Sequence, residues 1–358
     1  QIYCMLLSPF SPLLPDRIRP SVTWGAAQGT LLHLALAQTA QHHPGPVLLV
    51  TADVQHAGQI AAELRFFAPD DLPIIHFPDW ETLPYDVFSP LPELVSERLL
   101  TLHRLRGLQR GIVVVPVATL MQRILPPGFL DAHSLVLQTG QTLDFELFRR
   151  RLEQAGYQAV AQVMTHGEFA VRGSLIDLFP MGCATPLRLD LLDDELDSIR
   201  TFDPETQRTE QKIDQITLLP AREFPLDKEA ISRFRAAWRE TFAGDPQRSL
   251  IYRDVSEQQL PGGIEYYLPL FHHETATLLD YLPAQTLVRY PQSVSEDAQA
   301  YFAQVDARYQ QRCADIERPL LKPDALYLAA AELQDGFGPF LQLQYQAQSI
   351  ARDQNFAP

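Results

Sequence analysis

The sequence is poor in cysteine and has no long hydrophobic run. Its three cysteines are widely separated and form no CxxC pair (Cys4, Cys183 and Cys313). This pattern argues against a structural zinc site and points to a reducing cytoplasm. No apolar stretch approaches the roughly 20 residues that a helix needs to span a bilayer. The opening CMLLSPFSPLLP is too short and too interrupted by proline for a signal peptide. We therefore expect a cytoplasmic protein without a membrane partner.

Positive charge is also scarce. The 358 residues include 29 lysines and arginines against 44 aspartates and glutamates, a formal net charge of −15. Nucleic-acid binding draws most of its affinity from cations that neutralise phosphates, so tight non-specific DNA binding by the whole chain is not expected. A chain this acidic can still carry a local basic strip. Because it starts at Gln1 and stops in ARDQNFAP, we expect it to be a piece of a longer protein.

A nucleotide-binding motif is present only in outline. Residues 21–40, SVTWGAAQGTLLHLALAQTA, place two glycines and small residues before an amphipathic helix. A working phosphate-binding loop reads G-x-x-x-x-G-K-[ST]; its lysine contacts the phosphates and its hydroxyl holds magnesium. Here Gly25 and Gly29 are one residue too close, and Thr30 follows Gly29 without a lysine. We interpret the segment as a strand-to-helix turn that retains the form of the motif.

The second half of such a site is missing as well. Many nucleotide hydrolases place a magnesium-binding aspartate and a water-polarising glutamate at the end of an apolar strand. In residues 278–294, LLDYLPAQTLVRYPQSV, the strand instead ends at Arg289, Tyr290, Pro291 and Gln292. Two independent losses predict that this chain does not hydrolyse ATP. We predict no catalytic residues, no metal site and no cofactor in it.

The outer parts of the chain alternate short apolar strands with helices, which predicts a parallel sheet. Asp53 is the expected N-cap of the helix at 53–67. The later segments 286–291 and 325–334 are expected to return to the same sheet. The expected elements of the first part are strands at 46–52, 72–77 and from about 111, and helices at 53–67 and from about 92.

The middle of the chain has a different pattern. A helix at 142–157 precedes closely spaced strands with turn residues between them. This predicts a small antiparallel α+β domain, followed by a mostly helical stretch. The expected strands are 166–180, 185–192, 195–203 and 212–220. The expected domains are 20–123 with about 285–345, then 134–220, then 221–284, so that the first domain is interrupted by the other two.

Several ordered motifs give this pattern a family resemblance. They are GEFAVRGSLIDLFP, RLDLLDDELDSIRTFD, PGGIEYYLPLF, LLDYLP and PDWETLPYDVFSP. Together they resemble the UvrB-homologous N-terminal module of the bacterial transcription-repair coupling factors (Mfd), from about residue 20 to 345. The resemblance implies a UvrB-like fold: a degenerate, helicase-like (RecA-like) parallel-sheet domain 1A, interrupted by an α+β domain 2 and a helical domain 1B. In that family, ATP, magnesium, the DNA translocase motor and RNA polymerase binding belong to other domains of the longer protein.

The resemblance also implies a partner, UvrA, for the small middle domain. Arg172 and Arg188 match family arginines implicated in UvrA binding, and Leu192 stands where relatives often have an aromatic residue. The sequence pattern agrees with exposure of these residues. In PLRLDLLDDE, alternation puts Leu187, Leu189 and Leu191 on the core face, so Arg188, Asp190 and Leu192 point outward.

The neighbouring stretch EFAVRGS follows the same rule. Phe169 and Val171 are expected on one face, and Glu168, Ala170 and Arg172 on the other. Gly173 is expected to permit a bulge. The resulting prediction is an exposed patch of two guanidinium groups beside an apolar residue, which is a plausible protein-binding surface.

Two other functions remain open at this point. The chain could be an ATP-dependent, UvrB-like DNA helicase or damage-binding fragment, although the lysine and the two carboxylates that this requires are absent. It could also be a DNA clamp, which would bind with a steep salt dependence. Two basic runs could touch phosphates: Arg104, Arg106 and Arg110, and Arg149–Arg151. The second has helical spacing and is more typical of an exposed helix face.

Overall fold

The computed structural model describes residues 8–350 and 355–356 of the chain. Cys4, the start of the segment considered as a signal peptide and most of the closing ARDQNFAP lie outside these residues. No helix among the described residues is long and apolar enough to cross a membrane.

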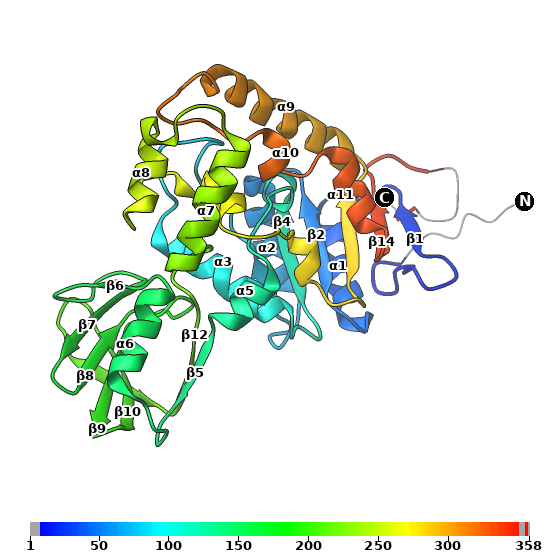
Figure 1. Ribbon diagram of the computed structural model, residues 1–358. Coiled ribbons are helices and arrows are strands. Elements are labelled where there is room, and N and C mark those ends of the chain that lie inside the picture. The colour runs from blue at the N-terminus through cyan, green and yellow to red at the C-terminus, as the bar shows by residue number, and fades with distance from the viewer. Residues whose placement is uncertain (1–7, 351–354, 357–358) are drawn as a thin grey trace, which may run out of the picture.

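Six parallel strands form the first sheet, in the order β1-β14-β13-β2-β4-β3 (Figure 1). The neighbouring interior strands β2 and β4 are buried along their whole length, which explains their continuous apolar sequences. The segment predicted at 286–291 is confirmed as β13. The bounds are β1 Ser21–Trp24, β2 Val47–Thr51, β3 Ile74–His76, β4 Ile112–Pro116, β13 Leu287–Pro291 and β14 Leu341–Tyr345.

Helices cover both faces of this sheet. Helices α1 (Gly29–His42) and α2 (Val54–Phe67) pack on one face, around Trp24 and Leu49. On the opposite face lie α3 (Pro92–Leu105), α9 (Val294–Arg312) and α11 (Ala330–Phe337). Asp53 caps α2 by accepting the His56 backbone N–H at 2.8 Å, as predicted. Two short helices, α4 (Val117–Leu120) and α5 (Pro127–Ala132), follow β4.

The prediction that 325–334 returns to the sheet is wrong. That stretch instead forms most of α11 and the end of α10 (Pro323–Leu326), and the returning strand is β14. Alanine and leucine favour the helix, and the Glu332 side chain accepts the Ala329 backbone N–H where α11 begins. In β14 the residues LQLQY alternate, as expected of a half-buried strand.

The second sheet is antiparallel except for β6, which runs parallel to β7. Its order is β11-β10-β9-β8-β7-β6, and α6 (Phe145–Gln154) packs on one face through Phe148 and Leu152. The chain enters this region through β5 (Leu135–Gln138) and leaves it through β12 (Gln215–Leu218). These two strands pair with each other and connect the antiparallel sheet to the rest of the molecule (Figure 1). The other bounds are β6 Gln158–Ala159, β7 Glu168–Arg172, β8 Leu175–Leu178, β9 Leu187–Leu192, β10 Glu195–Phe202 and β11 Thr209–Ile213.

Two details of the middle region differ from the prediction. Gly173 does not form a bulge: it lies in the tight turn between β7 and β8, with a φ of +64° that favours glycine. The single strand expected at 212–220 is divided, because its start belongs to β11 and its later part is β12, which pairs with β5.

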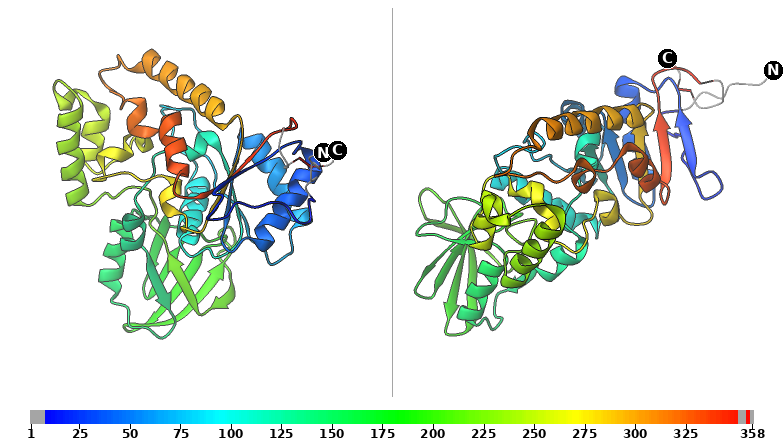
Figure 2. Two further views of the ribbon diagram at one scale, coloured as in Figure 1. Left: turned by 90° about the vertical axis from the view of Figure 1, so that its right-hand side faces the viewer. Right: turned by 45° about the horizontal axis from the view of Figure 1, so that its top comes forward.

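The helical region packs around aromatic side chains. Its core contains Phe234, Trp238, Tyr252 and Tyr267, and Tyr85 reaches it from the segment before α3. Val305 of α9 belongs to the same core, and in the left-hand view of Figure 2 the region lies above the antiparallel sheet. The elements are α7 Lys228–Thr241, η1 Pro246–Arg248, α8 Leu250–Ser256, η2 Ile264–Leu270 and η3 Leu278–Tyr281. We keep the division into domains 1A, 2 and 1B as a proposal that fits these three groupings.

Candidate functional site

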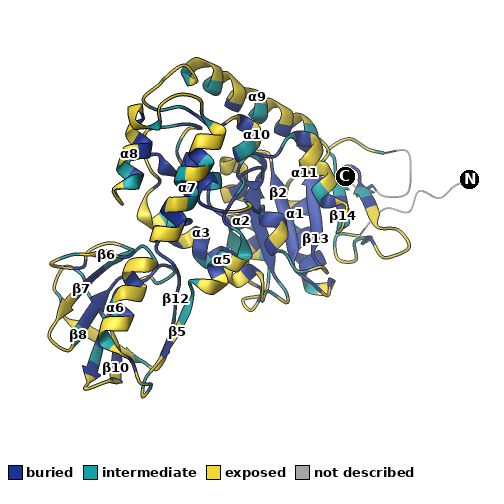
Figure 3. Ribbon diagram, in the orientation of Figure 1, coloured by how far each residue is buried: buried dark blue, intermediate teal, exposed yellow. Residues whose placement is uncertain are grey.

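The antiparallel sheet has one covered face and one open face. Leu187, Leu189 and Leu191 of β9 point towards α6 and are at most 4% exposed. Arg188, Asp190 and Leu192 lie between and after them, face the other way and are half-buried or exposed. Figure 3 colours each residue of this sheet by its burial. Strand register places Arg172 and Arg188 on this open face, since Arg172 pairs with Leu175, which in turn pairs with Asp190 of β9.

Arg172 is exposed at the end of β7, as predicted. Its Nη2 donates to the carbonyl oxygen of Ala161 at 3.2 Å, a contact with backbone that leaves the charge without a carboxylate partner in the described part of the chain. Val171 pairs with the buried Ile176 and so shares a face with Phe169, as predicted, although it is 40% exposed at the strand end. Ala170 is buried under Val163.

Arg188 faces the same way but is held inside the chain. Its Nε and Nη2 donate to the two carboxylate oxygens of Asp177 at 2.6 and 2.9 Å, and Nη1 donates to the Gln207 carbonyl at 3.3 Å. Its guanidinium carbon lies 4.9 Å from the centre of the Phe202 ring. The hydrogen bonds with Asp177 raise the pKa of Arg188. The expectation of a free guanidinium fork at this position is therefore wrong, although 18% of the side chain remains exposed.

Leu192 ends β9 and is 68% exposed. The next residue, Asp193, has a φ of +56° and starts the turn to β10. The acidic residues around it thus lie at a hairpin turn, where aspartate is a common turn residue. The exposed Leu192 side chain gives the open face an apolar contact point.

Two cations on this face were not predicted from the sequence. Arg200 of β10 lies directly opposite Arg188, and Lys212 of β11 lies directly opposite Arg200. Both side chains are exposed, and neither has a carboxylate within ion-pair distance among the described residues. Like charges on facing strand positions repel one another, so an anionic partner would relieve this arrangement. We call Arg172, Arg188, Leu192, Arg200 and Lys212 the docking face.

Asp177 was also missed, although the sequence contains a signal for it. It is the one charged residue in the apolar stretch SLIDLFP, and it is 1% exposed. A buried carboxylate needs a partner, and the outward-pointing arginine of the next strand supplies it. The positions of Arg200 and Lys212 could not be foreseen, because they depend on strand register across a bulge between Leu196 and Ser198 and an irregularity between Arg200 and Phe202.

The degenerate nucleotide loop lies at the edge of the parallel sheet, between β1 and α1. The backbone N–H groups of Ala26 and Ala27 donate to the carbonyls of Gln348 and Gln346 at 3.0 and 3.1 Å. A phosphate-binding loop uses such groups to hold the anion. In this chain the segment after β14 occupies them. Gly29 has a φ of +59° and, with Thr30, is exposed at the start of α1.

The segment in which a nucleotide hydrolase would carry its two carboxylates follows β13, two strands away from β1. Pro291 ends β13, and the Gln292 backbone N–H donates to the carbonyl of Tyr345 at 3.0 Å. Tyr345 pairs with both Trp24 and Pro291, so the two motifs flank the same residue. Arg289 is fully buried and stacks 3.7 Å from the centre of the Tyr345 ring. Burial lowers its pKa to about 10. A guanidinium offers no ligand to magnesium, whose preferred ligands are oxygen atoms.

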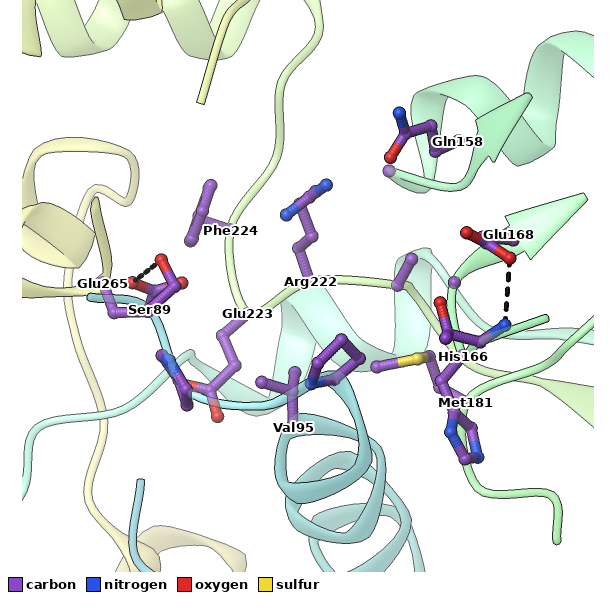
Figure 4. A pocket seen from close by; sticks show the side chains of 16 residues that line it. Ser89, Val95, Gln158, His166, Glu168, Met181, Arg222, Glu223, Phe224 and Glu265 are labelled. Carbon is purple, nitrogen blue, oxygen red and sulfur yellow. Dashed lines mark hydrogen bonds between the residues drawn. The ribbon is translucent and has the colours of Figure 1, made fainter. Parts of the chain in front are cut away.

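A small polar cavity of about 230 Å³ lies where the three regions meet (Figure 4). Ser89 Oγ donates to Glu265 at 2.8 Å, and burial raises the pKa of Glu265 to about 6. Beside it, Glu223 is buried and accepts from Arg98 Nε at 2.7 Å. Arg222 points towards the cavity in Figure 4. The residues around it form ion pairs and hydrogen bonds, and no serine or cysteine lining it contacts a histidine.

Comparisons with known proteins agree with this geometry. The family model of the UvrB interaction domain matches residues 135–224, which begin at β5 and end just after β12. The transcription-repair-coupling factor of Escherichia coli is 47% identical over 310 residues, which are 86% of this chain and 26% of that protein.

This chain belongs to the family of transcription-repair-coupling factors. The Haemophilus influenzae member is 44% identical over 320 residues, 88% of this chain and 28% of the relative. The Bacillus subtilis member is 29% identical over 257 residues, 68% of this chain and 22% of the relative. The chain thus spans about a quarter of the length of the transcription-repair-coupling factors that it matches. The resemblance to their UvrB-like N-terminal module, inferred from sequence motifs, is confirmed.

Proposed function

We propose that this chain is a non-catalytic module that recruits UvrA during transcription-coupled nucleotide excision repair. The observation that carries the proposal is the match of residues 135–224 to the UvrB interaction domain, because those residues form the sheet with the docking face. A module that resembles UvrB can offer UvrA the surface that UvrB offers. The proposed setting is the bacterial cytoplasm.

The chemistry of the docking face supports a protein partner with exposed carboxylates. Arg172, Arg200 and Lys212 are exposed cations without carboxylate partners among the described residues, on a chain with a net charge of −15. Guanidinium groups pair well with carboxylates, and Leu192 adds an apolar contact beside them. The charge of Arg188 is balanced by Asp177, which holds the guanidinium at a defined place. Its remaining N–H groups can contact the partner without a change in its own position.

We propose that the parallel-sheet domain acts as a scaffold and does not bind ATP. The missing lysine, the arginine in place of the two carboxylates and the occupied N–H groups of Ala26 and Ala27 all support this. ATP and magnesium would act in other domains of the longer protein, which would translocate on DNA and displace stalled RNA polymerase. Tethering this module to that motor would raise the local concentration of UvrA at the lesion.

A direct binding assay tests the proposal. Isothermal titration of UvrA into the purified chain should give a saturable, salt-sensitive isotherm, and UvrB should compete for the same site on UvrA. No heat of binding at micromolar concentrations of both proteins would contradict UvrA recruitment. Binding of UvrA that UvrB does not reduce would contradict the proposed mimicry.

A further inference from the structure

Three of the four cations of helix α7, all but Arg233, lie on one stripe. Lys228, Ser232, Arg235 and Arg239 recur at intervals of three to seven residues, which puts them on the same side of a helix with 3.6 residues per turn. The buried side, with Phe234 and Trp238, lies beside this stripe.

The carboxylates of α7 lie elsewhere on the helix. Glu229 pairs with Arg233 at 3.5 Å, and both are on another side, together with Glu240. Some arginines outside the helical region pair with carboxylates: Arg110 with Asp71 at 2.6 Å, for example. Arg106, which we considered as a phosphate contact, pairs with Asp131. Such pairs use the positive charge within the chain, so these positions offer little to an external anion.

The stripe borders a groove of about 560 Å³ between α7 and the end of α8. Arg235 Nε and Arg239 Nη2 both donate to the hydroxyl of Tyr252, at 3.2 and 2.7 Å. In the described part of the chain neither guanidinium has another acceptor or a carboxylate partner. The shared tyrosine therefore fixes the two groups side by side while most of their N–H donors stay available.

The other residues that line the groove are suited to an anion. Ser232, Ser256 and Gln258 offer neutral hydroxyl and amide donors, and Glu257 is the one carboxylate in the lining. Ile231, the apolar residue of the lining, is buried at 8% exposure. Tight protein interfaces usually need an exposed apolar or aromatic anchor, which this groove does not present.

We infer that this groove binds the phosphate backbone of a nucleic acid strand. Arg235 and Arg239 are separated by about 6 Å along the helix axis, and Lys228 and Arg239 by about 16 Å. One strand of a duplex carries a phosphate for about every 3.4 Å of rise, so the stripe spans several consecutive phosphates. Hydroxyl and amide side chains are common phosphate contacts. The binding is independent of sequence, because contacts with phosphate carry no sequence information.

Three cations and a net charge of −15 make this contact weak and sensitive to salt. Three neutralised phosphates correspond to a slope of about −3 for log K against log salt concentration on a duplex. The contact is independent of UvrA recruitment, since the groove lies on α7 and α8 and the docking face lies on the antiparallel sheet. Substitutions in the groove are therefore expected to leave the affinity for UvrA unchanged.

The test is fluorescence anisotropy of a labelled 20-base-pair DNA duplex titrated with the chain between 20 and 150 mM salt. We expect saturable binding at 20 mM with the slope given above. The double variant Arg235→Gln/Arg239→Gln should weaken binding at least tenfold and reduce the slope by about 2. A double variant with the same charge change at exposed positions elsewhere, Arg17→Gln/Arg150→Gln, should weaken it by less than threefold.

Two further variants distinguish a direct contact with phosphate from a loss of structure. Lys228→Gln touches none of the Tyr252 hydrogen bonds, so a loss of affinity in this variant at unchanged melting temperature supports a direct contact. Arg235→Lys/Arg239→Lys should retain most of the salt slope. No binding at 20 mM salt, or equal losses in the groove and control variants, would overturn the inference. Tighter binding of poly-glutamate than of DNA would overturn it in favour of an acidic protein partner.

Discussion

Arg188 and Asp177 form a two-pronged ion pair between neighbouring strands, with Nε–Oδ1 and Nη2–Oδ2 distances of 2.6 and 2.9 Å. The carboxylate is nearly inaccessible and the arginine is partly exposed. Arg188 thus belongs both to the interior of domain 2 and to its docking face. A loss of binding after its removal can therefore have a structural cause, whereas Arg172 has only a contact with a backbone carbonyl.

We predict that Arg188→Ala lowers the free energy of unfolding by about 3–5 kcal/mol, because the buried Asp177 is left without its partner. Arg172→Ala should change it by less than about 0.5 kcal/mol, as is usual at exposed positions. Urea denaturation followed by circular dichroism measures both. Equal stabilities of the two variants would show that the ion pair does not hold this sheet together.

Two buried arginines should respond in opposite ways to replacement by methionine. Arg98 pairs with Glu223 and stacks on Phe77, so Arg98→Met leaves a buried carboxylate unpaired and should cost about 3–5 kcal/mol. Arg289 has no hydrogen-bond acceptor among the described residues and gains only its contact with Tyr345. Arg289→Met should therefore raise the free energy of unfolding, by about 1–3 kcal/mol. Destabilisation by Arg289→Met would indicate that the guanidinium is compensated.

His272 should make the folded state sensitive to acid. Its Nε2 lies 2.9 Å from the Glu223 carbonyl oxygen, and burial lowers its pKa to about 4. The imidazole titrates near 6.5 in the unfolded chain, so between pH 6.5 and 4 the unfolded state binds more protons. The free energy of unfolding should fall across this window, by up to about 3 kcal/mol from this group. Above pH 6.5 the group contributes no pH dependence.

The variant His272→Gln isolates this effect. The difference in unfolding free energy between the wild-type chain and this variant should shrink or reverse as the pH falls from 7 to 4. Denaturation at pH 7, 5.5 and 4 measures it. A difference that stays constant would mean that His272 takes up its proton equally in both states.

Mg-ATP should not stabilise the chain. A site with a dissociation constant of 50 µM would add about 2.7 kcal/mol at 5 mM ligand, which shifts a thermal transition by several degrees. We expect no shift at 5 mM Mg-ATP, since the N–H groups of Ala26 and Ala27 are already bonded to Gln348 and Gln346. A saturable shift would revive the alternative of an ATP-dependent helicase fragment.

Most of the architecture could be predicted from the sequence, but only part of the candidate site could. Apolar runs such as β2 and the alternation of Leu187, Leu189 and Leu191 depend on local pattern, and both were predicted. The last strand of the parallel sheet was predicted at 325–334 and not at β14. The cause is that the first residues of an alanine-rich helix and a buried strand have similar runs of apolar residues. The partner of Arg188 depends on which strands pair and in what register, and this information is not local.

The central claim is that the docking face binds UvrA, and Arg172 is the residue that tests it most directly. The affinity of UvrA for the wild-type chain should be compared with that for Arg172→Ala, with Arg150→Ala on the opposite, α6-covered side as control. The proposal predicts at least a tenfold loss for Arg172→Ala, about 1.4 kcal/mol, at an unchanged melting temperature and with no loss for the control. Equal dissociation constants for all three proteins would contradict it.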